Sequence, residues 1–199
     1  MSVATPYFEQ MFAENDDPWA FRQRWYERRK RALTMALLTR PRYASIFEPG
    51  CANGELSAEL APRCDQLLCA DTASAAVTLA RTRLLGFDHA QVQQLRLPEQ
   101  WPTGSFDLIV LSELCYYLDV ADLHRVLDHA LASLSENGQL LACHWRASIE
   151  GCPQTGEQVH TLLRQRLDLP LVASHHDPDF LLDLWSRDGT SVATLEGLR

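Results

Sequence analysis

The sequence predicts an α/β fold, a three-layer sandwich with a seven-stranded, mostly parallel sheet. From residue 44 onward, short apolar runs alternate with longer segments whose apolar residues recur at helical spacing. Strands separated by helices in this way are typical of parallel sheets. The 199 residues suffice for one full-sized core and leave two domains undersized. We therefore expect one domain over 1–199, with an N-terminal helical cap at 1–41 and an α/β core at 42–199.

An aromatic and basic segment between residues 5 and 40 predicts the helical cap. Asp17 followed by Pro18 favours a helix start, because aspartate can cap free amides and proline suits the first helical position. Apolar side chains then recur at helical spacing from Phe21 to Leu37, until Pro41 blocks continuation. We expect this helix to pack on the domain, and a lid over a ligand is compatible with that position.

The order of elements in the core follows from the alternation of apolar runs. Helices are expected at 56–60, 75–85, 123–134 and 156–167. Strands are expected at 46–47, 67–70, 92–95, 108–111, 139–145, 171–175 and 180–185. Asn137-Gly138 predicts a turn into the fifth strand, which begins at Gln139. The turn-like Asp177-Pro178-Asp179 joins the last two strands, which we expect to form a C-terminal antiparallel hairpin at one end of the sheet.

The composition argues against several classes of partner. The formal net charge is −8, whereas phosphate binding needs a basic surface, so we expect no nucleic-acid partner and favour a neutral or cationic small molecule. No apolar run approaches the roughly 20 residues that cross a bilayer, and the first residues lack the pattern of a secretory signal. We expect a cytoplasmic protein without a membrane partner. The six cysteines lack metal-ligand spacing, which favours free buried thiols and no metal site.

The most informative stretch is the loop E-P-G-C-A-N-G at residues 48–54, between the first strand and a helix near Glu55. Glycine permits a positive φ and removes the Cβ that would hold a ligand away. Open parallel sheets bind ligands at the carboxyl ends of their strands, which is where this loop falls. The candidate ligand contacts in the loop are Glu48, Gly50, Cys51, Ala52, Asn53 and Gly54.

Two carboxylates indicate the kind of ligand. Glu48 lies two places before the glycine, where it would repel the pyrophosphate of a dinucleotide and suits a ligand with an ammonium and a sulfonium group. Asp71, 23 positions further on, ends the second strand and is placed to accept hydrogen bonds from both hydroxyls of a ribose, with Thr72 beside it. The alternative for Asp71 is a helix cap before residues 73–85.

These residues resemble the class I methyltransferases that use S-adenosylmethionine and release S-adenosylhomocysteine, over residues 44–145 at least. The resemblance implies their Rossmann-like fold, their cofactor and methyl transfer. It places Ser112 and Glu113, at the end of the fourth strand, beside the reacting methyl. The segment L-R-L-P at 95–98 occupies the loop that contacts adenine, so Leu97 is the candidate for packing on the ring. Many members have a glycine in place of Ala52.

The whole chain also resembles the nodulation protein S family. The shared motifs are D-D-P-W-A-F-R-Q-R-W-Y-E-R-R-K-R near the N-terminus, L-S-E-L-C-Y-Y-L in the centre and C-H-W-R later in the chain. Nodulation protein S methylates the amino group of a deacetylated glucosamine on a chitooligosaccharide. The resemblance therefore implies a small-molecule acceptor, an amino sugar or a similar amine.

Several residues near the strand ends are candidates for catalysis. His144 ends the fifth strand and is the first candidate base, and Glu113 is the second. Tyr116 and Tyr117 are candidates for stacking on a sugar ring or contacting the methyl, and Trp145 and His160 for lining the acceptor pocket. Each also has a structural interpretation, as a hydrogen-bond partner or as part of the core.

The N-terminal helix offers two pairs of side chains one turn apart. Trp25 and Arg29 share one face, and Tyr26 and Lys30 share another. Either pair is a candidate to close over the cofactor, with its cation bound to the cofactor's carboxylate. The alternative is a solvated basic face paired with local acids.

Two other functions are compatible with the predicted fold. The first is NAD-dependent oxidoreduction, against which Glu48 and the lack of a G-x-G-x-x-G motif argue. The second is a non-catalytic module that keeps the cofactor as a structural or sensing ligand. Nothing local to the sequence excludes that module.

Overall fold

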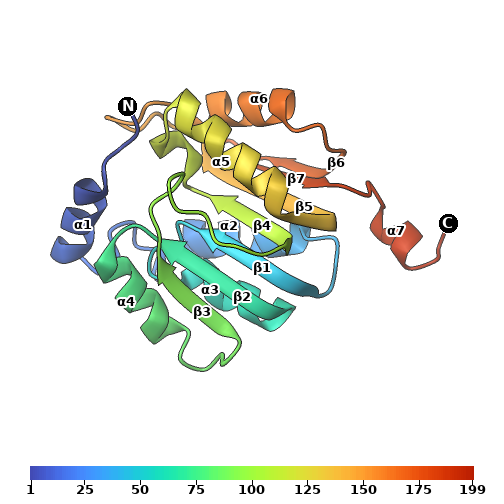
Figure 1. Ribbon diagram of the computed structural model, residues 1–199, viewed down its shortest axis with the longest axis horizontal. Helices are drawn as coiled ribbons and strands as arrows, with labels where there is room; N and C mark the ends of the chain where they lie inside the picture. The colour runs from blue at the N-terminus through green and yellow to red at the C-terminus, as the bar shows by residue number, and fades with distance from the viewer.

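A seven-stranded sheet in the order β3-β2-β1-β4-β5-β7-β6 runs through the centre of the protein, which a computed structural model describes over residues 1–199 (Figure 1). The strands are β1 (Tyr43–Pro49), β2 (Cys64–Asp71), β3 (Ala90–Gln94), β4 (Phe106–Ser112), β5 (Leu134–Trp145), β6 (Leu171–His176) and β7 (Phe180–Ser186). Pairing is parallel from β3 to β5, and β7 pairs antiparallel with both β5 and β6. The predicted sheet, with its antiparallel hairpin at one end, is confirmed.

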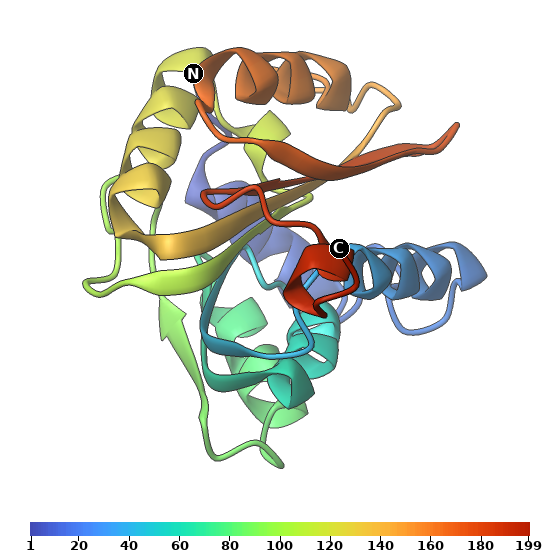
Figure 2. The ribbon, with the colours of Figure 1, turned by 90° about the vertical axis from the view of Figure 1, so that its right-hand side faces the viewer.

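Helices cover both faces of this sheet, with orange α6 and blue α2 on opposite sides in Figure 2. They are α1 (Thr5–Glu14), α2 (Trp25–Leu37), α3 (Glu55–Leu60), α4 (Ser74–Arg83), α5 (Val120–Ser133), α6 (Gly156–Arg166) and α7 (Val192–Leu195). Two 3₁₀ turns, η1 (Ala61–Arg63) and η2 (Cys115–Tyr117), complete the elements. No helix combines the length and the apolarity needed to cross a membrane.

The central strands are apolar on both faces because both faces are covered. In β4, Leu108 and Val110 enter the core beneath α3 and α4, while Ile109 and Leu111 enter the core beneath α5 and α6. All four side chains are 0% exposed. Side chains alternate along a strand, so a continuous apolar run is the expected pattern of a buried parallel strand.

Helices α5 and α6, which cover the same core on one face of the sheet, have the clearest start signals in the sequence. The Asp119 carboxylate accepts a hydrogen bond from the Asp122 amide at the start of α5. Thr155 and Gln158 form a capping box at the start of α6. Four residues of α5 then form one buried stripe at helical spacing, Leu123, Val126, Leu127 and Ala130.

The N-terminal cap differs from the prediction. It contains two helices, and α2 begins at Trp25 rather than at Asp17-Pro18. Ala20 adopts a positive φ of 57°, a left-handed conformation that cannot continue a right-handed helix. The Asp17 carboxylate does bind amides, those of Phe21 and Arg22, but it closes a turn rather than starting a helix.

The fifth strand also begins earlier than predicted, at Leu134 rather than at Gln139. Leu134 pairs with Phe106, and the next pair is Gln139 with Leu108. The residues between these pairs bulge out of the ladder, since β5 advances further than β4 over the same stretch. Asn137-Gly138 lies in this bulge and does not separate α5 from β5.

Candidate functional site

A cavity of about 770 Å³ opens at the carboxyl ends of the parallel strands. Its walls include Gly50 after β1, Asp71 of β2, Leu95 after β3, Glu113 after β4 and Trp145 of β5. The chain moves outward from β1 to β2 and β3 on one side and returns through β4 on the other. This reversal is the point at which open α/β sheets bind their ligands.

The N-terminal segment forms the opposite wall of this cavity. The amide of Val3 donates to the carbonyl of Tyr117 at 2.8 Å, and the hydroxyls of Thr5 and Thr72 lie 2.7 Å apart. Phe8 of α1 packs edge-on against the ring of Tyr117, with centroids 4.9 Å apart. Residues 3–8 therefore span from η2 to the end of β2, a position compatible with the expected lid.

A second, smaller cavity of about 60 Å³ shares part of its wall with the large one. Gly50, Ala52, Lys30 and Glu113 line both. Among the predicted ligand contacts, the small cavity alone adds Glu48, Cys51, Asn53 and Ser112.

The glycine loop has three residues with positive φ, Gly50 at 73°, Ala52 at 50° and Gly54 at 81°. Ala52 holds this conformation at a cost of about 1 kcal/mol or more, which a glycine at this place would avoid. Gly54 lines neither cavity. A Cβ at Gly54 would lie 3.0 Å from the Cα of Ala80, so this glycine lets α3 approach α4 and its predicted ligand contact is not supported.

Glu48 is buried at the end of β1 and faces the small cavity. One carboxylate oxygen accepts a hydrogen bond from the Ser57 hydroxyl at 2.5 Å, and the Cys69 thiol lies 3.7 Å from the same oxygen. Burial raises the pKa of Glu48 to about 7. A cation in the small cavity would therefore favour the charged form.

Asp71 lies at the end of β2 on the wall of the large cavity. Its two carboxylate oxygens accept hydrogen bonds from the amides of Ala52 and Ala73, both at 2.9 Å. Helix α4 begins at Ser74, and no side chain caps its N-terminus, so the helix-cap alternative for Asp71 does not hold. Burial raises the pKa of Asp71, and each oxygen keeps capacity for a further donor.

Leu97 and Thr72 both line the large cavity. Leu97 packs against the core beneath α5, together with Leu95. The hydroxyl of Thr72 is paired with that of Thr5, so it ties the N-terminal segment to β2.

A second charged cluster surrounds Glu113, which follows β4 with a positive φ of 53°. Lys30 donates to Oε1 at 2.7 Å, while the Tyr116 hydroxyl and the Trp145 amide donate to Oε2 at 2.6 and 3.0 Å. Lys30 also pairs with Glu27 at 3.2 Å. Since all five residues line the large cavity, this cluster forms one part of its wall.

Lys30 is therefore committed to protein carboxylates. Burial opposes its charge, but Glu113 and Glu27 outweigh burial and raise the pKa of Lys30. The predicted bond from Lys30 to a cofactor carboxylate would compete with two partners already in place. The alternative, a solvated basic face paired with local acids, fits this residue in its acidic partners but not in its solvation, since Lys30 is buried.

The other predicted pair on α2 lies outside both cavities. Trp25 is 69% exposed, with the Arg28 guanidinium 6.0 Å from the centre of its ring. Arg29 forms an ion pair with Asp177 at 2.7 Å. The structure thus brings Tyr26 and Lys30 to the cavity and turns Trp25 and Arg29 away from it.

His144 and His160 do not reach the site, which corrects two predictions. Their side chains are 0% and 1% exposed and line neither cavity. Both ring nitrogens of His144 are engaged, by the Cys115 amide at 3.2 Å and by His160 at 3.1 Å. Burial lowers the pKa of His144. His144 is not the base for a reaction in this cavity.

Tyr116, Tyr117 and Trp145 do line the large cavity. The hydroxyl of Tyr116 is used by Glu113, whereas Trp145 is 40% exposed and presents its ring. No group of three or more histidine, cysteine, aspartate or glutamate side chains is placed to hold a metal ion.

One polar group of the site, Arg24, was not singled out by the sequence, and two of the predicted residues, Tyr26 and Asn53, carry a polar atom without a partner. Arg24 lines the large cavity, and its guanidinium forms no ion pair. The hydroxyl of Tyr26 in the large cavity and the amide oxygen Oδ1 of Asn53 in the small one are buried without a hydrogen-bond partner. Buried polar atoms are nearly always paired, so these two are positions where a ligand atom or water completes the structure.

Comparison with known proteins gives consistent matches. The family model Nodulation protein S (NodS) matches residues 8–169. A Nodulation protein S from Rhizobium tropici is 33% identical over 133 residues, which cover 63% of this chain and 54% of that relative. Another from Bradyrhizobium diazoefficiens is 30% identical over 128 residues, covering 63% and 61%. The chain thus spans little more than half the length of these curated relatives.

Solved structures similar to this chain agree with the match to the nodulation protein S family. The N-methyltransferase NodS from Bradyrhizobium japonicum WM9, crystallised with S-adenosyl-L-homocysteine, is 26% identical with a TM-score of 0.82, covering 92% of this chain and 97% of that one. A candidate methyltransferase from Pseudomonas syringae is 64% identical with a TM-score of 0.75, covering 82% and 100%.

Proposed function

The chain belongs to the nodulation protein S family, and on that premise we propose that it transfers a methyl group from S-adenosylmethionine to the nitrogen of a small amine. When bound, S-adenosylmethionine would supply an electrophilic methyl on a sulfonium. The protein's contribution is to bind this cofactor, to hold the acceptor in line and to receive a proton from it.

The cofactor assignment is supported by the fit of the polar groups in the two cavities. Asp71 has two carboxylate oxygens with spare capacity for the hydroxyls of a ribose. Leu95 and Leu97 offer an apolar surface for adenine. Arg24, whose guanidinium forms no ion pair, suits the carboxylate of the cofactor.

The observation that carries the proposal is that Glu48 and Asn53 line the same small cavity. A carboxyl group with a pKa of about 7 and an unpartnered amide oxygen lie beside the glycine loop. Both accept hydrogen bonds from an ammonium, and neither would stabilise a pyrophosphate. This chemistry favours S-adenosylmethionine over NAD, and no matched protein named above supports the oxidoreductase alternative.

The wall formed around Glu113 supports an amine as the acceptor. An ammonium group must lose a proton before its nitrogen can attack. Glu113 Oε1 accepts from Lys30 alone and has room for an amine N–H, while Oε2 already accepts from Tyr116 and Trp145. We assign Glu113 as the carboxylate that binds the amine and takes its proton, and Lys30 as the residue that holds this carboxylate in position.

Within the amines, we favour an amino sugar. The half-exposed ring of Trp145 offers a face on which a sugar can stack, and the free Tyr26 hydroxyl offers a hydrogen bond to a ring substituent. Holding such an acceptor in line with the methyl can lower the barrier by roughly 7–11 kcal/mol.

The test is an assay of methyl transfer with a matched panel of acceptors. The panel contains glucosamine, a chitooligosaccharide with one free amino group, its fully N-acetylated counterpart and simple alkyl amines. Mass spectrometry should find one added methyl on the nitrogen of an amine and none on the N-acetylated sugar. Failure of every amine, by protein that binds the cofactor, would instead favour the non-catalytic module.

A further inference from the structure

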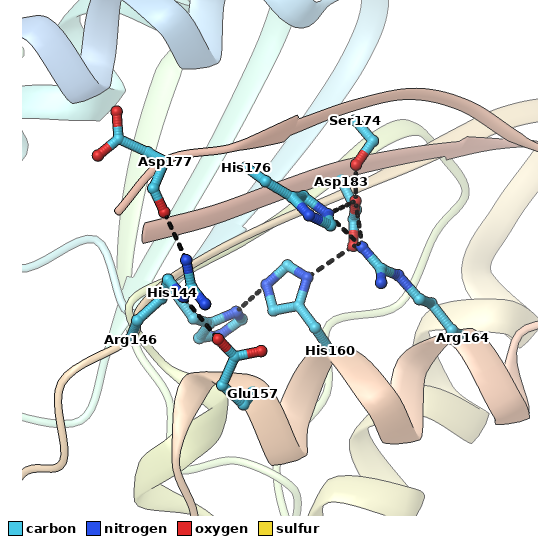
Figure 3. Close-up of polar contacts among 9 residues, drawn as sticks. All are labelled: His144, Arg146, Glu157, His160, Arg164, Ser174, His176, Asp177 and Asp183. Atoms are coloured by element: carbon cyan, nitrogen blue, oxygen red, sulfur yellow. Dashed lines mark hydrogen bonds and ion pairs between the residues drawn. The ribbon is translucent and has the colours of Figure 1, made fainter. Parts of the chain in front are cut away.

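Three buried side chains form a hydrogen-bonded chain (Figure 3), which begins beside the turn η2 of the cavity wall. It contains His144 of β5, His160 of α6 and Asp183 of β7, which are 0%, 1% and 0% exposed. His144 Nδ1 lies 3.1 Å from His160 Nε2, and His160 Nδ1 lies 2.7 Å from the Asp183 carboxylate. The wall itself is joined to the chain by the Cys115 amide, 3.2 Å from His144 Nε2.

The direction of every hydrogen bond in this chain follows from its first donor. A backbone amide can only donate, so His144 Nε2 must be the unprotonated nitrogen. The neutral ring then carries its proton on Nδ1 and donates to His160 Nε2. By the same logic, His160 carries its proton on Nδ1 and donates to Asp183. Both rings are thereby fixed in a single tautomer and a single orientation.

Asp183 anchors the far end of the chain. Its carboxylate accepts from the Ser174 hydroxyl at 2.5 Å and from two nitrogens of Arg164, the shortest contact being 2.8 Å. Burial opposes ionisation, but the hydrogen bonds from His160 and Ser174 and the charge of Arg164 lower the pKa of Asp183. The anchor therefore stays charged and held from three sides.

The near end of the chain holds the segment that shapes the acceptor wall. Cys115 starts the 3₁₀ turn η2, which carries Tyr116, whose hydroxyl fixes Glu113. The ring of Tyr116 packs edge-on against His144, with centroids 5.5 Å apart. Glu113 itself has a left-handed backbone, which a non-glycine residue keeps only where its surroundings impose it.

We propose that His144 and His160 are positioning residues, which hold the turn Cys115–Tyr117 and thereby keep Glu113 aimed at the acceptor amine. This inference rests on the proposed methyl transfer to an amine. Two imidazoles in a core cost desolvation that apolar side chains avoid, and here that cost is offset by hydrogen bonds that run from the cavity wall to Asp183.

Two substitutions at one position separate positioning from simple packing. Gln in His144→Gln can place an oxygen near the site of Nε2 and keep the acceptor for the Cys115 amide. Asn in His144→Asn places its amide near the site of Nδ1, which keeps the contact with His160 and leaves the Cys115 amide unpaired. The two variants are matched, because each loses one of the two hydrogen bonds of His144 and each replaces the imidazole ring with a smaller amide.

The readouts are kcat and KM for the amine, the Kd for S-adenosylhomocysteine, the melting temperature and hydrogen exchange at the Cys115 amide. We expect the kcat of His144→Gln to exceed that of His144→Asn by about tenfold, with equal Kd values. In the Asn variant the unpaired Cys115 amide loosens the turn that positions Glu113, and the loss of one buried hydrogen bond corresponds to a factor of about ten. Exchange at Cys115 should be faster in the Asn variant only. Equal kcat values in the two variants, or a kcat that follows the melting temperature alone, would overturn the proposal.

A measurement on the unmodified protein covers the case in which neither variant folds. Long-range ¹H–¹⁵N spectra should show the proton on Nδ1 in both buried histidines. A proton on Nε2 of either ring would overturn the proposal. The spectra and the exchange experiment need no acceptor, so failure of wild-type protein to methylate any amine would remove the proposed function without deciding these tests.

Discussion

Two carboxyl groups at neighbouring strand ends have different surroundings and are assigned to different parts of the cofactor. Asp71 is held by two backbone amides, whereas Glu48 has a hydroxyl and a thiol as partners. Hydrogen bonds from the amides favour the charged form of Asp71, and a charged carboxylate can accept further hydrogen bonds from the hydroxyls of a ribose. A pKa near 7 makes Glu48 responsive to a cation instead.

We predict that Asp71→Ala weakens binding of S-adenosylhomocysteine by about 1–3 kcal/mol, because buried ribose hydroxyls lose a charged partner. Isothermal calorimetry on the folded variant measures this. Asp65→Ala is the matched control, since Asp65 lies on the same strand and its side chain is 61% exposed. Unchanged affinity in Asp71→Ala would show that the ribose lies elsewhere.

We predict a pH dependence of stability that comes from Glu48. Its folded pKa of about 7 lies above the usual 4.5, so the folded state binds the proton more tightly. The stabilisation is present below pH 4.5 and is lost as pH rises through 7, by about 3 kcal/mol at most. Urea unfolding of the ligand-free protein should show this loss in the wild type and not in Glu48→Gln. Parallel curves for the two proteins would contradict it.

The sequence located the strand ends but not the faces on which their side chains lie. His144 and Trp145 are adjacent at the end of β5, and adjacent strand residues point to opposite faces. Trp145 faces the cavity and His144 faces α6, a choice that depends on the register of the sheet. Arg24 was indistinguishable in the sequence from its aromatic and basic neighbours, because only the folded chain shows that it lines the large cavity.

At the scale of elements, helix α2 is attached to strand β4 through Lys30. We predict that Lys30→Met destabilises the protein by about 3–5 kcal/mol, because it leaves the buried Glu27 and the partly buried Glu113 without their cation. Arg28→Met, on the exposed face of the same helix, should change stability by about 0.5 kcal/mol or less. Urea unfolding of both variants is the measurement. Equal stability of the two would show that the ion pairs do not hold α2 in place.

The N-terminal segment gives a second prediction at this scale. Deletion of residues 1–14 should weaken binding of S-adenosylhomocysteine, because these residues form one wall of the large cavity. Calorimetry should show the loss while circular dichroism shows an intact sheet. A folded truncated protein with full affinity would contradict a role for this segment in binding.

Elements with strong local signals were predicted well. The buried stripe of α5 and the antiparallel hairpin of the last two strands depend only on nearby residues, and both were found. The break between α1 and α2 was missed because it depends on the left-handed backbone of Ala20, which side-chain spacing does not encode. The early start of β5 was missed because a bulge replaces the expected turn.

At the scale of the whole molecule, the fold explains why residues distant in sequence form one site. The sheet order reverses between β1 and β4, which brings the ends of β1, β2, β4 and β5 to one edge, and the N-terminal segment lies across that edge (Figure 1). The similarity to the NodS methyltransferase structure confirms the predicted class I methyltransferase fold. The acceptor remains the part of the function that the fold specifies least, because it depends on a few side chains around Glu113.

Calorimetric titration of the folded wild-type protein with S-adenosylmethionine, S-adenosylhomocysteine and NADH tests the central claim most directly. If the loop after β1 receives a cationic nucleoside, both sulfur compounds should bind with saturable heat at one site per chain, and NADH should give none. Saturable binding of NADH together with no heat from either sulfur compound would contradict it.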